Sequence, residues 1–178
     1  FVQSKTPDPS DCEDRVFVGE HFIAVIDGVT SKSGVRWGGL RSGFVAVELI
    51  VESLAAMSKD ADGLQVMRTL NNAIARWYRK NSVYDTMRTH STERCAASIV
   101  VYSQAKREIW IVGDCQALVG GKKFSQRADT DRVTSNARAL FIEAALLEGK
   151  SVEDLLKRDE GREFILPLLQ KQRLFQNK

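Results

Sequence analysis

The chain contains few cysteines, few prolines and no long apolar segment. Its three cysteines are odd in number and widely spaced, which does not indicate a disulfide framework, and no Cys-x-x-Cys motif occurs. We therefore expect a reducing, cytoplasmic compartment. No uninterrupted apolar run is long enough to span a bilayer, and no signal-peptide pattern opens the chain, so we expect no membrane partner.

An excess of charge of one sign is also missing. The 26 Lys and Arg residues nearly balance the 23 Asp and Glu residues, which leaves a net charge of +3. This balance, without any long basic block, argues against a nucleic-acid partner. With 178 residues, 43% of them hydrophobic and 28% charged, the chain is expected to form a single globular domain over 1–178. Composition does not indicate an oligomeric state.

A β-hairpin flanked by acidic residues is the strongest pattern near the N-terminus. The segments 15–18 and 21–26 are rich in residues that favour strands, and Gly19-Glu20 lies between them. A glycine at the first central position suits a type II′ two-residue turn. We therefore predict a hairpin in which the two residues that flank this turn pair with each other.

This register would bring carboxylates together at the open end of the hairpin. Asp14 and Asp27 fall on the same face as diagonal neighbours, whereas Glu13 points to the opposite face. Because like charges at close range repel, a bound divalent cation is the usual resolution, and oxygen ligands favour Mg²⁺, Mn²⁺ or Ca²⁺ over zinc. The alternative stays open that Asp27-Gly28 is an ordinary turn and that the acidic pair is a solvated surface.

The remaining sequence predicts helices and strands in turn. The expected elements are a polar loop over 29–35 above the acidic residues, helices over about 37–57 and 64–80, a loop over 81–93, strands over 96–102, 108–112, 117–119 and 122–124, and helices around 133–147 and 164–169. The strand over 22–26 is apolar on both faces, as in a layered α/β arrangement. Asp114 follows a strand as Asp27 does, and it is either a second acidic site residue or a turn residue.

Four motifs occur in an order that resembles a known family. Glu13-Asp14-Arg15, Phe22 to Gly28, Cys95 to Tyr102 and Gly113 to Val119 resemble the metal-dependent serine/threonine phosphatases of type 2C, the PPM family. The resemblance covers about 10–125, and a helical segment follows over 126–178. It implies an α/β fold, a four-layer α-β-β-α sandwich of two antiparallel sheets flanked by helices. It also implies hydrolysis of phosphoserine and phosphothreonine in protein substrates with two or three Mn²⁺ or Mg²⁺ ions.

The resemblance also implies roles for single residues. Asp27 would bridge the two metal ions, and the Gly28 carbonyl would bind one of them. Glu13 and Asp14 would hold the metals directly or through bound water, and Asp114 would match an aspartate near a third metal position. Asp27 and Asp14 are thus the expected catalytic residues, through a metal-activated water that attacks phosphorus.

The chain departs from the family pattern after Gly121. The family carries two further aspartates in Asp-Gly and Asp-Asn motifs, and neither motif occurs beyond this residue. Lys5 alone stands in for the arginine that contacts phosphate, and it is alternatively a solvated surface residue. We therefore expect an enzyme whose remaining strands follow residue 178, a non-catalytic phosphatase-like binding or regulatory module, or an unrelated α/β domain with structural Asp-Gly turns.

Overall fold

The computed structural model describes residues 12–30, 34–126 and 129–175. The chain separates into two compact units, Phe1–Gln126 and Arg127–Lys178, and each is described here by itself. The boundary coincides with the end of the segment that carries the sequence motifs. That both units form one domain stays a prediction.

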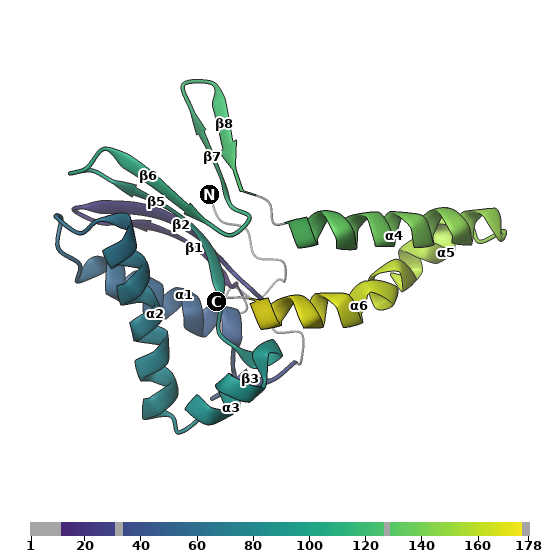
Figure 1. Ribbon diagram of the computed structural model, residues 1–178, viewed down its shortest axis with the longest axis horizontal. Coiled ribbons are helices and arrows are strands. Elements are labelled where there is room, and N and C mark those ends of the chain that lie inside the picture. Colours follow the sequence, from purple (N-terminus) through teal and green to yellow (C-terminus); the bar gives the residue numbers. More distant parts are fainter. Residues whose placement is uncertain (1–11, 31–33, 127–128, 176–178) are drawn as a thin grey trace. The chain divides into compact units, whose positions relative to one another are not determined.

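A four-stranded antiparallel sheet forms the centre of the first unit. Its strand order is β1 (Asp14–Val18), β2 (Phe22–Gly28), β5 (Ala97–Ser103) and β6 (Glu108–Val112). Along β2 the side chains alternate strictly between buried and exposed, because successive residues of a strand point to opposite faces. The sheet therefore has one covered face and one open face (Figure 1).

Two helices cover one face of this sheet. Helices α1 (Ser42–Ala55) and α2 (Gly63–Lys80) lie on the same side of the strands (Figure 1). Phe22, Ala24 and Ile26 of β2 point toward them and are at most 1% exposed. Their side chains join one hydrophobic core with apolar residues of both helices. The prediction of antiparallel strands flanked by helices is confirmed.

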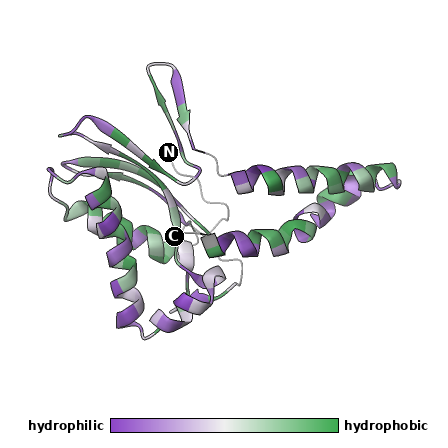
Figure 2. Cartoon of the chain, viewed as in Figure 1, coloured by the Kyte–Doolittle hydropathy of each residue, from purple (hydrophilic) through white to green (hydrophobic). Residues whose placement is uncertain are grey.

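The other face of the sheet is apolar but largely uncovered among the described residues. Its exposed hydrophobic side chains alternate in sequence with the core residues and come from all four strands: Val16, Val18, Ile23, Val25, Tyr102 and Ile109. The strands are accordingly hydrophobic over most of their length (Figure 2). We call this surface the open face.

The predicted turn of the first hairpin is wrong by one position. The Gly19 amide donates to the Phe22 carbonyl at 2.9 Å, so the turn lies at Glu20-His21 and not at Gly19-Glu20. Phe22 follows this turn as the first residue of β2, and its side chain is buried in the core. The pairing register shifts by two residues as a result. A shift of two leaves every side chain on its predicted face, since the side-chain period of a strand is two.

The predicted start of the first helix is also wrong. Instead of helix from residue 37, the chain forms a small hairpin of β3 (Arg36–Trp37) and β4 (Leu40–Arg41). Gly38 and Gly39 make its turn with φ of +58° and +85°. Two residues with positive φ are the requirement of a type I′ turn, which glycine meets without strain.

The predicted loop over 81–93 contains two short helices. They are α3 (Tyr84–Thr89) and a 3₁₀ turn (Ser91–Glu93). Met87 of α3 is buried in a second apolar cluster that also contains Tyr78. Val83 and Tyr84 pack against the same cluster, so apolar side chains anchor this largely polar segment to the core.

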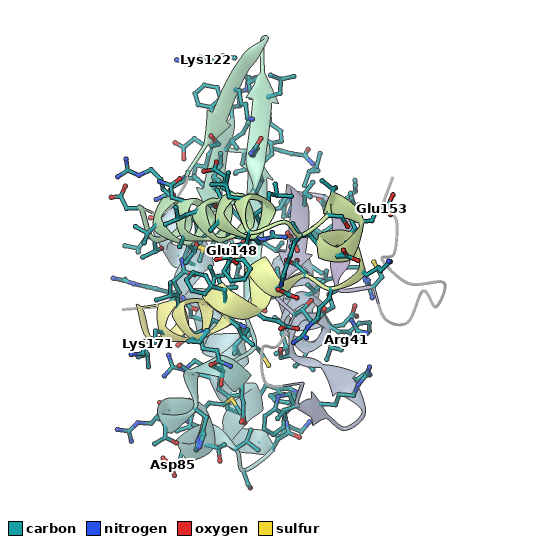
Figure 3. All side chains as sticks on the ribbon, turned by 90° about the vertical axis from the view of Figure 1, so that its right-hand side faces the viewer. Arg41, Asp85, Lys122, Glu148, Glu153 and Lys171 are labelled. Atoms are coloured by element: carbon teal, nitrogen blue, oxygen red, sulfur yellow. The ribbon has the colours of Figure 1, made fainter. Side chains whose placement is uncertain are left out.

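A separate two-stranded sheet follows the central one. It consists of β7 (Gln116–Val119) and β8 (Lys122–Ser125), close to the prediction. Lys122 lies at its tip (Figure 3). Its apolar side chains Leu118 and Phe124 are exposed. An isolated two-stranded hairpin is marginally stable in water, so its order depends on what it packs against.

The second unit is helical. It contains α4 (Asp129–Leu147), α5 (Val152–Lys157), α6 (Glu160–Gln172) and a 3₁₀ turn (Arg173–Phe175). The rings of Phe141 and Phe164 stack with centroids 4.9 Å apart, which joins α4 to α6. The prediction of a helical segment is confirmed. Over the described part of the chain, none of the helices combines the length and hydrophobicity that a membrane span requires.

Candidate metal centre

Three polar side chains stand in register at one end of the open face. Asp14 of β1 pairs directly with Asp27 of β2, and Asp27 pairs with Ser98 of β5. Paired residues share a face, and neighbouring strands lie roughly 4.8 Å apart. The result is a row, Asp14–Asp27–Ser98, that crosses three strands at the edge of the apolar open face. The two aspartates are directly opposite each other, closer than the diagonal placement predicted from the sequence.

The electrostatics of this row favour a cation. Two like charges directly opposite each other on a sheet are destabilising. Asp14 Oδ1 is buried, and no described residue hydrogen-bonds to it. An ionised oxygen withdrawn from water normally has a partner, because its desolvation is costly. A positive ion beside Asp14 and Asp27 would satisfy this oxygen and offset the repulsion.

Glu13 has a different environment from its neighbour Asp14. Its side chain points to the helix-covered face and is buried. Oε2 accepts a hydrogen bond from Thr30 Oγ1 at 2.6 Å, and Oε1 accepts one from the Gly43 amide at 3.1 Å. Arg41 NH1 lies 3.8 Å from Oε2. The carboxylate therefore has protein partners on both oxygens, as a side chain that anchors the start of α1 would.

The start of α1 packs closely against the end of β2. The N-cap residue Arg41, labelled in Figure 3, offers no side-chain hydrogen bond to the first turn. The Glu13 carboxylate supplies that acceptor and its negative charge suits the positive end of the helix dipole. Gly28 and Gly43 allow this contact: a Cβ on Gly28 would overlap the Glu13 carbonyl oxygen. The Gly28 amide donates to that carbonyl at 2.9 Å.

Asp114 joins the row from the loop after β6. Its Oδ1 accepts a hydrogen bond from Ser98 Oγ at 2.6 Å. Ser98 is the last member of the row, so the contact brings a third carboxylate to the same end of the sheet. The sequence prediction compared Asp114 with Asp27 because both follow a strand. The structure brings the two together through Ser98.

Besides burial, the charges of all three aspartates raise the pKa of the Cys115 thiol. Burial and, after it, the charges of Asp27, Asp114 and Asp14 raise the pKa of this thiol to about 11. A thiolate would be a further negative charge among three carboxylates. The cysteine is therefore protonated at neutral pH, and the surroundings of its sulfur are strongly negative.

The donor set fits a hard divalent ion held by few protein ligands. Mg²⁺ and, by the same oxygen chemistry, Mn²⁺ are commonly bound through one or two carboxylates and several waters. Asp14 and Asp27 provide two carboxylates, and one Asp14 oxygen has no hydrogen-bond partner in the described part of the chain. Within 12–30, 34–126 and 129–175, however, no three His, Cys, Asp or Glu side chains are arranged to hold a metal together. The site could bind such an ion only through few protein oxygens.

The predicted site residues thus divide into three groups. Asp14 and Asp27 pair at the end of the open face, Asp114 is hydrogen-bonded to Ser98 next to Asp27, and Gly28 is the last residue of β2. Glu13 lies on the opposite face, as the side-chain alternation predicted. Lys5 falls outside the described residues.

Sequence reasoning missed two residues that shape the site. Ser98 connects Asp27 to Asp114, and Thr30 holds Glu13. Neither has a local motif. Only knowledge that β5 pairs with β2 would have placed Ser98 opposite Asp27, because that pairing joins segments about 70 residues apart.

Comparisons with known proteins gave one result. A scan against protein-family models found no match, and neither did a search of curated proteins. Among solved structures, the Mycobacterium tuberculosis serine/threonine phosphatase PstP/Ppp is similar to this chain with 20% sequence identity and a TM-score of 0.44. The match covers 80% of this chain and 55% of that chain, so the chain spans about half of that structure's length. The chemistry of the site rests on its own residues.

Proposed function

We propose that the chain carries a divalent-metal-dependent phosphomonoester hydrolase site that acts on phosphoserine or phosphothreonine in proteins. The observation that supports it best is the direct pairing of Asp14 with Asp27, together with the buried Asp14 oxygen, to which no described residue hydrogen-bonds. Carboxylates in this state bind Mg²⁺ or Mn²⁺, and the order of the sequence motifs resembles that of the type 2C phosphatases.

In this proposal the residues of the row hold the ion and keep it at the sheet edge. Asp27 and Asp14 supply carboxylate oxygens, the Gly28 carbonyl is a further candidate ligand, and Asp114 approaches from the side of Ser98. A bound Mn²⁺ or Mg²⁺ would supply a water of lowered pKa and would offset the negative charge of a phosphate group. The Glu13 contact to Gly43 fixes the backbone behind Asp27 and stays out of the chemistry.

The direct test is hydrolysis of p-nitrophenyl phosphate by the natural full-length protein, with and without Mn²⁺. We expect Mn²⁺-dependent turnover that falls at least about 100-fold in Asp27→Asn, since metal catalysis supplies several kcal/mol. Asp85→Asn is the matched control, because the Asp85 side chain is 94% exposed and distant in sequence from the row. Turnover that is independent of Mn²⁺, or unchanged in Asp27→Asn, would refute the proposal.

A non-catalytic phosphatase-like binding or regulatory module is the second candidate. It is favoured by a specific observation, the lack among the described residues of any three-ligand metal group. A folded protein that binds Mn²⁺ weakly and shows no turnover would support it. In either case, a reducing cytoplasmic compartment fits Cys12, Cys95 and Cys115, which form no disulfide with one another.

A further inference from the structure

We infer that Ser98 is a positioning residue that holds the Asp114 carboxylate in place beside Asp27. The inference rests on the proposed function, because it concerns the same candidate metal centre. It assigns the orientation of a carboxylate at the edge of that centre to one hydroxyl group. Three features support it: the Ser98–Asp114 hydrogen bond, the pairing of Ser98 with Asp27, and the backbone conformation of Gly113.

The hydrogen bond is short and arises from a fixed donor. Ser98 Oγ donates to Asp114 Oδ1 at 2.6 Å, and it accepts a hydrogen bond from the Asp114 amide at 3.4 Å. Ser98 is only 8% exposed and sits inside β5, whereas Asp114 is exposed at the end of β6. The buried hydroxyl, fixed within β5, therefore restrains the exposed carboxylate, and not the reverse.

The strand register places this hydrogen bond next to the two paired aspartates. Ser98 is the direct partner of Asp27, whose other neighbour is Asp14. A carboxylate bound to Ser98 is therefore held at the end of the row that contains both other aspartates. Without the hydroxyl, Asp114 would be free to turn into solvent, and repulsion from the other two carboxylates would drive it there.

Gly113 shows that the backbone is shaped around this contact. Its φ of +84° is a conformation that side chains rarely adopt, and a Cβ at this position would overlap Ser98 Oγ. The loop after β6 thus passes so close to Ser98 that only glycine fits. This close approach is what brings the next residue, Asp114, within hydrogen-bond distance.

The consequence is a measurable effect on metal affinity. Groups that orient a metal ligand through a hydrogen bond typically change metal affinity by about 10- to 100-fold when they are removed. Among the described residues, the Ser98 hydroxyl donates a hydrogen bond to the Asp114 carboxylate. Its removal should therefore act through Asp114.

The experiment is a Mn²⁺ titration of the full natural chain, followed by the electron paramagnetic resonance signal of free Mn²⁺. We expect Ser98→Ala to bind Mn²⁺ at least about 10-fold more weakly than the wild type. Ser98→Thr keeps a hydroxyl and should restore most of the affinity. In an Asp114→Ala background, Ser98→Ala should have no further effect, because coupled residues are not additive. Circular dichroism confirms the fold of each variant.

The outcomes separate this inference from the proposed function. If the wild type binds Mn²⁺ and Ser98→Ala binds equally well, or if the two changes are additive, Ser98 has no positioning role although the metal centre stands. If the wild type binds no Mn²⁺, both are refuted. Should Ser98→Ala fail to fold, Ser98→Cys preserves the size but weakens the donor, and the same loss of affinity is expected.

Discussion

The two faces of the four-stranded sheet are built from the same strands and have opposite character. Phe22, Ala24 and Ile26 point to the helices and are fully buried, whereas Ile23 and Val25 between them are exposed. Helices α1 and α2 supply the partners on one side, and the described residues supply few on the other. The alternation of side chains along a strand therefore decides which face of the sheet a residue occupies. The elements packed on that face decide whether the residue is buried or exposed.

The same difference applies to two adjacent acidic residues. Glu13 points to the helix face, where Thr30 and the Gly43 amide satisfy its oxygens. Asp14 points to the open face, where it pairs with Asp27 and keeps a buried oxygen that accepts no hydrogen bond from the residues described. One carboxylate is thus structural, and the next is available to a ligand.

The largest expected effect is on the free energy of unfolding, and it differs between the two faces of the sheet. Ile26→Ala should lower the free energy of unfolding by about 3–4 kcal/mol, because it leaves a cavity in the core. Val25→Ala, one residue away but about half exposed, should cost less than about 1 kcal/mol. Urea unfolding of both variants measures the difference. Equal and large losses would show that a further layer covers the open face in solution.

A smaller effect distinguishes the two acidic neighbours. Glu13→Gln should destabilise the protein by about 1.5–3 kcal/mol, since it weakens charge-assisted hydrogen bonds to the start of α1, and should leave Mn²⁺ affinity nearly unchanged. Asp14→Asn should do the reverse: it relieves repulsion with Asp27, so stability stays equal or rises by up to about 1 kcal/mol, while Mn²⁺ affinity falls. Thermal unfolding and a Mn²⁺ titration together measure both. Loss of stability in both variants would contradict the contrast.

The smallest effect concerns the Cys115 thiol. Its pKa is raised to about 11, first by burial and then by the charge of Asp27. In metal-free buffer at pH 8, the thiol should therefore react slowly with iodoacetamide, because only the thiolate is nucleophilic. Asp27→Asn removes a negative charge and lowers that pKa, so alkylation should become several-fold faster. Cys95, which is buried, is the internal control in mass spectrometry. An unchanged rate would place Asp27 farther from the thiol.

Part of this arrangement could be predicted from the sequence. Alternation along 15–18 and 21–26 placed Asp14 and Asp27 on one face and Glu13 on the other, and that held although the predicted turn was wrong. A register shift of two residues leaves each side chain on the same face of the sheet. Whether Asp14 lies directly opposite Asp27, however, depends on the position of the turn. The position of the turn follows from the pairing of β1 with β2, which the local pattern does not determine.

The remaining features depend on contacts between distant segments. Ser98 faces Asp27 only because β5 pairs with β2, and Glu13 meets Gly43 only because α1 begins at Ser42. The predicted helix began five positions earlier, at Trp37, because the apolar stripe continues into the hairpin of β3 and β4. Positive φ at Gly38 and Gly39, not hydrophobicity, sets that boundary.

The measurement that tests the central claim most directly is Mn²⁺ binding by the wild type and by Asp27→Asn, with Asp85→Asn as the control. If the paired aspartates form a cation site, the wild type and the control bind Mn²⁺ equally well, and Asp27→Asn binds it at least about 10-fold more weakly. Equal binding by all three proteins, or binding by none, would contradict a metal centre at the end of the open face.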